Sequence, residues 1–326
     1  MRFIWKEVAV IKNIHPFREF WLDCYSTILF TIYCALYKDR TRIYNNNYSY
    51  SIVTAGRSCV HKFKTICLEI SMNSFQNSFL KKYDEFSLKS KRNLKHVNEI
   101  LEKNNLILLL GVDLYYWIDD GIHWKRNHIQ HFSLVKEYDA DKNEYVVLET
   151  GARGYKEYRI SEKKFLKAAK MADVNSIVYQ TIEGSINLLD NKTIFGNNID
   201  MIIQSIDCVI GEFDSIWTVT DYSFKDMLYF MEFVQTHLYA IENRQKANSL
   251  LMKSLFEQNK NQLCYRAACE FTELSDRYYS LKAQLMTDAK SGKLNESIDR
   301  YRKYLLDYLK IEKEIWKKIS ENFKED

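Results

Sequence analysis

Cys24 has the surroundings of a catalytic nucleophile. It follows Asp23, a residue type that often begins helices, and it precedes a long apolar run, so we expect it in the first turn of a helix. The free backbone N–H groups and the dipole at a helix start favour a thiolate, which predicts a lowered pKa for this thiol. A thiolate held in this way can attack a carbonyl carbon. The alternative, that Cys24 is a small buried apolar residue, remains open on composition alone.

His131 and Glu149 are the candidate general base and the carboxylate that orients it. His131 opens the run HFSLVKEYD and Glu149 lies near the end of the run YVVLET, and both runs read as strands joined by a polar loop at 139–143. A hairpin turning near the middle of this loop brings residues 131 and 149 opposite each other. The carboxylate would then hold the imidazole in the tautomer that accepts the Cys24 proton.

Asp113 and Tyr115 are candidates for lining the substrate pocket. They lie two residues apart in the run GVDLYYW, which reads as a strand, so their side chains would share one face. The alternative role for Asp113 is to cap a turn. A metal site is a further possibility at His123, His128 and His131, but residues three apart on a strand point to opposite faces and no additional cluster completes a ligand set. We therefore predict neither a metal nor another bound cofactor.

These residues need a scaffold of mixed helices and strands in the first part of the chain. We predict helices at 24–37, 73–104 and 161–172, and strands at 3–11, 48–54, 65–71, 106–117, 128–138, 144–150 and 176–181. After residue 223 the sequence reads as amphipathic helices at about 224–258, 263–289 and 294–323. The expected fold class is α+β, with a catalytic domain at 1–182, a connecting segment at 183–222 and a helical domain at 223–326.

Composition and charge limit the class of protein. A chain of 326 residues with 46% apolar and 28% charged residues has room for about two domains with buried cores. The net charge of +4 is too even for a protein whose main partner is nucleic acid. The seven cysteines include no CxxC pair, which favours reduced thiols over disulfides or zinc. Without a signal-peptide pattern or an apolar run of ~20 residues, we expect a cytoplasmic protein and no membrane partner.

Three blocks of the sequence resemble the papain-like fold of the C39-like cysteine peptidases and, more closely, the butirosin-type acyltransferases. The blocks are DCYSTILFTIYCAL at 23–36, LLLGVDLYYW at 108–117 and HIQHFSLVKEYDADKNEYVVLET at 128–150. The resemblance covers about residues 15–180. It implies a papain-like cysteine protease fold with an appended C-terminal helical domain. It also implies Cys24 as nucleophile, His131 as base and Glu149 at the position where the family usually has Asp.

The resemblance implies a reaction as well. Butirosin-type enzymes form amides from a thioester on the phosphopantetheine of an acyl or peptidyl carrier protein, in antibiotic and other nonribosomal peptide-type biosynthesis. A small amine or an aminoacyl group would be the acceptor. The sequence has no GxxxxGK[ST] or GxGxxG motif, which disfavours a nucleotide-driven ligase and favours an activated acyl donor. The alternatives are a C39-like cysteine peptidase and a non-catalytic binding protein. The peptidase is disfavoured because Arg18 and Glu19 occupy the region of its oxyanion-hole Gln.

Two further regions have open roles. The densest basic run contains Lys81, Lys82, Lys89, Lys91, Arg92 and Lys95. It is either a solvated helix face or a docking surface for an acidic carrier protein. The C-terminal helices either cover the site and shape the amine pocket, or serve in stabilisation or in a homodimer.

Overall fold

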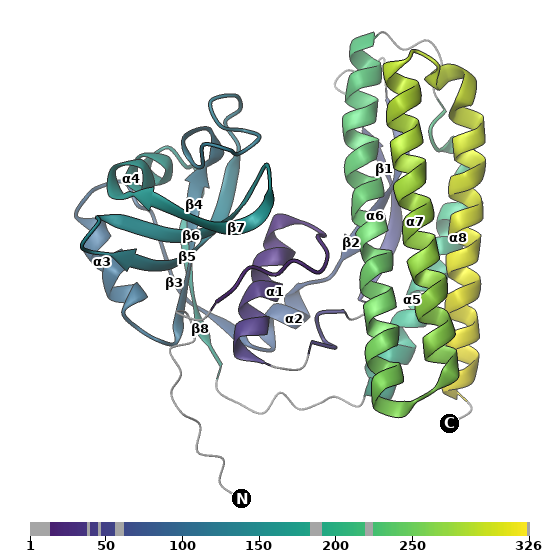
Figure 1. The fold of residues 1–326 in the computed structure, drawn as a ribbon, viewed down its shortest axis with the longest axis horizontal. Coiled ribbons are helices and arrows are strands. Elements are labelled where there is room, and N and C mark those ends of the chain that lie inside the picture. Colours follow the sequence, from purple (N-terminus) through teal and green to yellow (C-terminus); the bar gives the residue numbers. More distant parts are fainter. Residues whose placement is uncertain are drawn as a thin grey trace, which may run out of the picture. The chain divides into compact units, whose positions relative to one another are not determined.

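The chain folds into two compact units of mixed and helical composition (Figure 1). The computed structural model describes residues 14–37, 40–44, 47–55, 62–182, 191–218 and 224–324. The α+β unit consists of 1–19, 23–40 and 73–186, and the helical unit of 20–22, 41–72 and 187–326. The predicted α+β class with a helical C-terminal region is confirmed. The predicted strand at 3–11 lies outside the described residues.

A six-stranded antiparallel sheet forms the centre of the α+β unit. Its strands, in spatial order, are β3 (Leu80–Phe86), β8 (Ser176–Thr181), β4 (Leu106–Asp113), β5 (Gln130–Asp139), β6 (Glu144–Gly151) and β7 (Gly154–Ser161). Every residue of β4 is buried, because both faces of the sheet are covered. On one face, α3 (Asn93–Leu101) and α4 (Glu162–Lys170) pack their apolar sides against alternate residues of β4, β5 and β6.

The helix α1 (Cys24–Leu36) lies against the other face of this sheet (Figure 1). The hydroxyl of Tyr25 in α1 is 3.2 Å from that of Tyr179, which pairs with Ile107 on the face of β4 opposite to α3. The Asp23 carboxylate caps the helix by accepting the backbone N–H of Ser26 at 2.8 Å. The predicted helix at 24–37 is therefore confirmed, and Cys24 is its first residue.

The predicted helix at 73–104 is wrong. The segment contains α2 (Asn73–Asn77), the strand β3 and the helix α3. β3 is an edge strand whose sequence LKKYDEF carries the charges that suit an exposed edge, and charged residues of this kind also read as helix. The other edge strand, β7, is also absent from the prediction, because its charged residues hide the apolar pattern of a strand: they alternate with aromatic ones. It begins at Gly154, whose φ of +83° closes the tight turn after β6.

The other strands predicted within the described residues of this unit are present, with one shortened. The strand expected at 106–117 ends at Asp113 and continues as a 3₁₀ turn, η2 (Leu114–Tyr116). The Asp113 carboxylate accepts the backbone N–H of Tyr115 at 3.0 Å, which turns the chain away from the sheet. The strands predicted at 128–138, 144–150 and 176–181 correspond to β5, β6 and β8, and the helix predicted at 161–172 to α4.

The helical unit contains the hairpin of β1 (Tyr48–Ala55) and β2 (Phe63–Ile70) and the helices α5 (Asn191–Gly211), α6 (Phe224–Asn259), α7 (Gln262–Lys290) and α8 (Leu294–Lys324). The three long C-terminal helices were predicted. The compact units nevertheless divide the chain differently from the expected boundaries at 182 and 222. The hairpin belongs here because the hydroxyls of Tyr48 and Tyr50 donate to the buried Glu312 carboxylate of α8, at 2.6 and 2.7 Å. None of the helices in the described part of the chain is long and apolar enough to cross a bilayer.

Candidate functional site

His131 and Glu149 meet on neighbouring strands of the α+β unit. The distance between His131 Nε2 and Glu149 Oε1 is 3.2 Å. The register differs from the predicted one: Leu134 pairs with Leu148, so Ser133 rather than His131 comes opposite Glu149. The hairpin turns later than predicted, because Asp139 still pairs with Glu144, and a bulge follows Val135. His131 and Glu149 are therefore diagonal neighbours, which long side chains can still bridge.

The Glu149 carboxylate is buried and well supplied with donors. Its side chain is 3% exposed. Oε2 accepts the indole N–H of Trp117 at 3.1 Å, and Oε1 accepts the backbone N–H of Thr150 at 2.8 Å in addition to its contact with His131. These hydrogen bonds offset the loss of hydration of the buried carboxylate. The carboxylate is thus fixed in position before any substrate arrives.

The charge of Glu149 sets the properties of His131. The imidazole is 15% exposed, and burial alone would lower its pKa. The hydrogen bond and the charge of Glu149 outweigh burial, so that the pKa of His131 is raised above its usual 6.5. Because Nε2 faces the carboxylate, Nδ1 is the nitrogen left to accept a proton. This is the tautomer that the general-base role requires.

Cys24 lies close to the same carboxylate, but its thiol is not activated in the way the sequence suggested. Its pKa is raised to about 12 by burial first, and then by the negative charges of Glu149 and Asp23. The predicted lowering is therefore wrong. The helix start supplies favourable N–H groups, but the carboxylate that caps α1 is adjacent to the thiol and acts against them. The raised pKa favours the neutral thiol form of Cys24.

The three predicted residues gather around one carboxylate rather than forming a continuous chain of hydrogen bonds. Glu149 contacts His131 directly, and its charge acts on Cys24. Within the described ranges, no hydrogen bond joins the Cys24 thiol to His131. Catalytic hydrogen bonds are often long in substrate-free enzymes and shorten when the substrate binds. Proton transfer from the thiol to His131 would require such an approach.

Two residues of this cluster were not predicted from the sequence. The indole N–H of Trp117 and the backbone N–H of Thr150 both donate to the Glu149 carboxylate. The Thr150 side chain also acts to lower the pKa of Cys24, against the larger effects that raise it. A signal existed for Trp117, because a buried indole N–H needs an acceptor and Trp117 closes the GVDLYYW block. For Thr150 the only signal was its position directly after Glu149.

Asp113 and Tyr115 lie with His128 rather than with His131. The Asp113 carboxylate, 2% exposed, is 2.6 Å from His128 Nδ1, and the Tyr115 ring stacks on the imidazole at 4.3 Å. Val112, not Asp113, pairs with His131, so Asp113 points to the opposite face of the sheet. The two residues do not share a strand face as predicted, because Tyr115 belongs to the turn η2. Asp113 instead has the capping role that the sequence left as an alternative.

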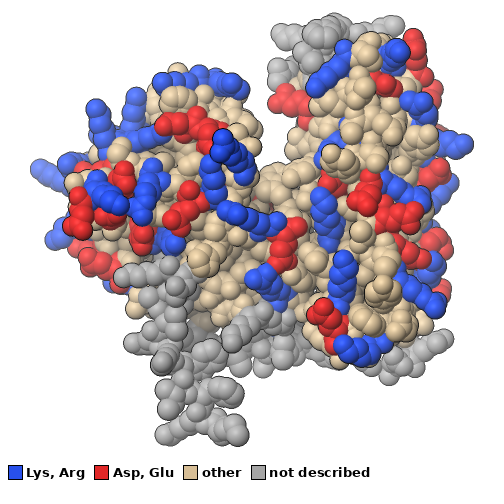
Figure 2. Space-filling model, in the orientation of Figure 1, with Lys and Arg blue, Asp and Glu red and all other residues tan. Residues whose placement is uncertain are grey.

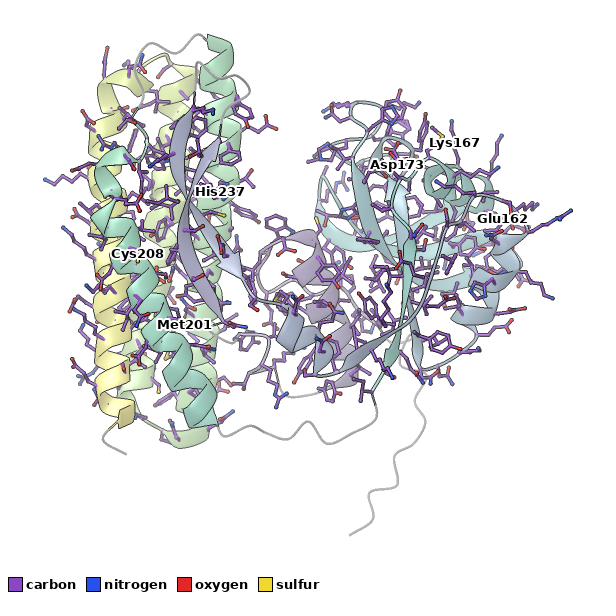
Figure 3. The ribbon with its side chains drawn as sticks, turned by 180° about the vertical axis from the view of Figure 1, so that it is seen from behind. Glu162, Lys167, Asp173, Met201, Cys208 and His237 are labelled. Atoms are coloured by element: carbon purple, nitrogen blue, oxygen red, sulfur yellow. The ribbon has the colours of Figure 1, made fainter. Side chains whose placement is uncertain are left out.

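The basic run does not form one helix face. Lys81 and Lys82 lie on β3, while the other members lie between Lys89 and Lys95, in the turn before α3 and in α3 itself. Lys82 contacts Glu85, Lys91 lies 3.0 Å from Glu162, and Lys89 donates to backbone carbonyls. Glu162 lies at the start of α4 (Figure 3). Figure 2 shows acidic and basic side chains interspersed on this unit, which favours a solvated surface over a docking surface of one sign.

The cluster around Glu149 thus contains a buried carboxylate, the imidazole that it contacts and the thiol on which its charge acts. In the part of the chain that the structure describes, no three His, Cys, Asp or Glu side chains are placed to bind one ion. Comparison of the chain with protein-family models gave no match, and comparison with curated proteins gave none either.

Proposed function

We propose that this chain is a papain-like cysteine acyltransferase that forms an amide bond from a carrier-bound thioester. The observation that carries the proposal is the buried His131–Glu149 pair, in which Nε2 contacts the carboxylate and Nδ1 is left to act as a base. Cys24 begins α1, and the charge of the same carboxylate acts on its thiol. A histidine held by a buried carboxylate is the arrangement that activates a cysteine or serine nucleophile on several unrelated folds. Cys24 is the nucleophile in this proposal, His131 the base and Glu149 the orienting group.

The architecture of the α+β unit supports a papain-like fold. The candidate nucleophile begins a helix packed on an antiparallel sheet, and the candidate base and carboxylate lie on adjacent strands later in the chain. This is the order that the resemblance to butirosin-type acyltransferases implies. The replacement of Asp by Glu at position 149 fits the register, because the longer side chain spans the offset between Glu149 and His131.

The first half of the reaction would transfer the acyl group to the enzyme. The Cys24 S–H proton passes to His131 Nδ1 as the sulfur attacks the thioester carbonyl carbon. The tetrahedral intermediate collapses, the bond to the carrier's pantetheine sulfur breaks, and His131 returns the proton to that leaving thiolate. Because the thiol pKa is about 12, proton removal accompanies attack instead of preceding it.

The second half would transfer the acyl group to an amine. The amine nitrogen attacks the acyl-enzyme carbonyl, His131 accepts the amine proton, and the bond to Cys24 sulfur breaks with return of that proton to the sulfur. The product is an amide, and the partners are an acyl or peptidyl carrier protein and a small amine or aminoacyl acceptor. A thioester supplies the free energy for this exchange, so that no bound cofactor is needed. A cytoplasmic setting with reduced thiols and a secondary-metabolite pathway fit this chemistry.

Intact-protein mass spectrometry tests the proposal. Incubation with an acyl-pantetheine thioester should add one acyl mass to the wild-type chain, on Cys24, and none to Cys24→Ala. Cys208, an exposed cysteine on α5 (Figure 3), supplies the matched control, since Cys208→Ala should be acylated like the wild type.

Addition of a primary amine at millimolar concentration should then release the acyl group as amide. Release mainly as free acid, or cleavage of ordinary peptides, would favour a C39-like hydrolase instead. If Cys24 resisted acylation by every thioester tried, the chain would be a non-catalytic binding protein.

A further inference from the structure

The connection between β4 and β5, residues 114–129, holds apolar side chains at the surface. Ile122 and Ile129 are 67% and 41% exposed, although isoleucine is among the residue types most often buried. The two ends of this connection are tied together, because the Leu114 N–H donates to the Ile129 carbonyl at 2.9 Å. The two isoleucines are therefore exposed on an ordered connection of the α+β unit.

Basic side chains from this connection and from α4 gather on its aromatic rings. Lys125 Nζ is 4.0 Å from the centroid of the Trp124 ring, and Lys164 Nζ of α4 is 5.7 Å from the same centroid. Lys167, about one turn further along α4, has its Nζ 4.4 Å from the centroid of the Tyr116 ring. Cations are attracted to the faces of aromatic rings, so these contacts bring lysines of two elements onto one surface.

The positive charge of this surface is not balanced by the acids near it. The two acids of the connection already have partners, since Asp119 contacts Lys164 and Asp120 lies 2.9 Å from Lys156. Three exposed cations form no ion pair with any carboxylate among the described residues: Lys125, Arg126 and Lys167. Asp173, exposed beyond the end of α4, lies at the same end of the unit as Lys167 and offsets part of this charge (Figure 3). A net positive charge remains beside the exposed isoleucines.

The backbone of Lys125 adopts a conformation that suits other residue types better. Its φ is +52°, in the left-handed region that glycine and asparagine adopt at lower cost. Its N–H donates to the Tyr115 carbonyl at 3.1 Å, which fixes the turn. Folding alone gives no preference for a long cationic side chain at this position. A role in binding explains the charge of Lys125 better than a role in the turn does.

The connection is also close to the His131–Glu149 pair along the chain. It includes Trp117, whose indole N–H donates to Glu149 at 3.1 Å, and it leads into β5, which begins at Gln130, the residue before His131. A partner bound to this surface would therefore lie beside the proposed base. In the proposed reaction the carrier protein must come to this region, because it delivers the thioester.

We propose that this surface docks the acyl or peptidyl carrier protein, with Lys125, Arg126 and Lys167 binding acidic residues and the phosphate of the pantetheine arm. Lysine and arginine form strong charge-assisted contacts with carboxylates and phosphates, and the exposed isoleucines add apolar contact. An anionic membrane fits less well, because lysines already cover the Trp124 ring and Asp119, 73% exposed on the same connection, would be repelled. The identity of the partner rests on the proposed function.

Binding of a fluorescently labelled, stand-alone acyl carrier protein that bears phosphopantetheine tests this without any acyl transfer. Fluorescence anisotropy gives the Kd at low and at physiological ionic strength, and binding should weaken as salt rises. The double variant Lys125→Glu with Arg126→Glu should weaken binding about tenfold, and Asp173→Asn should strengthen it about twofold. The matched controls are Lys81→Glu on the edge strand β3 and Lys103→Glu before the start of β4, both exposed lysines, and they should stay within about twofold of the wild type.

Acylation kinetics give a second measurement. The double variant should raise the KM for an acyl-carrier donor about tenfold, whereas its rate with an acyl-pantetheine thioester, which lacks both protein and phosphate, should stay within about twofold of the wild type.

The two proposals can fail separately. Failure of the wild type to bind the carrier, equal weakening in the lysine controls, or sedimentation with phosphatidylserine vesicles in place of carrier binding would overturn the docking surface. Carrier binding that depends on Lys125 and Arg126, without acylation of Cys24 by any thioester, would leave the surface in place and count against the proposed function.

Discussion

Two histidine–carboxylate pairs lie close together in the sequence of the α+β unit, and they differ in almost every other respect. Both side chains of the His131–Glu149 pair are largely buried, at 15% and 3% exposed. In the other pair the Asp113 side chain is buried but His128 is 57% exposed. The Asp113 pair has the shorter contact, 2.6 Å against 3.2 Å. The length of the histidine–carboxylate contact alone would therefore favour the pair that we do not propose as catalytic.

The surroundings of the two pairs explain the difference. Glu149 accepts hydrogen bonds from Trp117 and Thr150, and its charge acts on Cys24, so His131 is part of a buried polar cluster that includes the carboxylate nearest the proposed nucleophile in charge effect. Asp113 accepts the backbone N–H of Tyr115 and contacts His128, whose ring stacks on that of Tyr115. His128 is therefore part of the turn that follows β4. Burial from water and an orienting carboxylate favour a general base, and of the two histidines His131 is the more buried. The following predictions test this distinction.

Removal of the base should have the largest effect. His131→Ala should reduce the rate of Cys24 acylation by roughly 10²–10⁴-fold, the range for loss of a general base. His128→Ala should change it less than about threefold, because the contacts of His128 within the described residues are with Asp113, Tyr115 and Tyr116. Acylation is measured by intact mass against time. A severe loss in His128→Ala with a normal rate in His131→Ala would exchange the roles of the two pairs.

Removal of the orienting charge should have the next largest effect. Glu149→Gln retains the size of the side chain but loses the charge that raises the pKa of His131. We expect a loss of roughly 10–100-fold in acylation rate, the range seen when a carboxylate partner of a functional histidine is replaced. Asp113→Asn is the matched change in the other pair and should leave the rate within about twofold of the wild type. A loss in Glu149→Gln that exceeds the loss in His131→Ala would show that the carboxylate has a role beyond orientation.

The two pairs should also differ in their effect on pH dependence. The pKa of His131 is raised by Glu149, and the base acts only when neutral, so the acylation rate should fall as the pH falls through a midpoint above 6.5. In Glu149→Gln the remaining influence is burial, which lowers the pKa, so the midpoint should move to lower pH. His128→Ala should leave the midpoint where it is. The measurement is the acylation rate between pH 5 and pH 9, and a midpoint that moved in His128→Ala instead would assign the titration to the exposed pair.

The sequence predicted the local parts of this site and missed the parts that depend on distant contacts. The start of α1 at Cys24 follows from Asp23 and the apolar run, and the β5–β6 hairpin from two alternating strands around a polar loop. The direct opposition of His131 and Glu149 was wrong because the turn position and a bulge are set by the pairing itself. The contact between His131 and Glu149 forms nevertheless, because the Glu149 side chain is long enough to reach a diagonal neighbour.

The thiol pKa shows the same limit more clearly. The helix-start argument considers only residues next to Cys24 in the sequence, and by that argument the pKa should fall. The burial of the thiol and the charge of Glu149, which lies far along the chain, reverse the direction, and the charge of the neighbouring Asp23 adds to them. The edge strands β3 and β7 were missed because their charged residues face solvent, which removes the apolar pattern that identifies a strand.

The smallest effect on activity, and a measurable effect on stability, should come from Asp113→Asn. The buried carboxylate accepts the Tyr115 N–H and contacts His128, so replacement by an amide weakens the His128 contact and turns one acceptor oxygen into a donor. We expect the free energy of unfolding to fall by about 1–3 kcal/mol, the range for a disturbed buried hydrogen bond, with the acylation rate within about twofold of the wild type. Urea denaturation followed by circular dichroism gives the first quantity and intact-mass kinetics the second. Glu149→Gln should show the opposite result: its acylation rate should fall by more than the change in its free energy of unfolding can explain. If Asp113→Asn lost most of its activity while its unfolding free energy stayed the same, the exposed pair would belong to the site, and the division between a catalytic pair and a structural pair would be wrong.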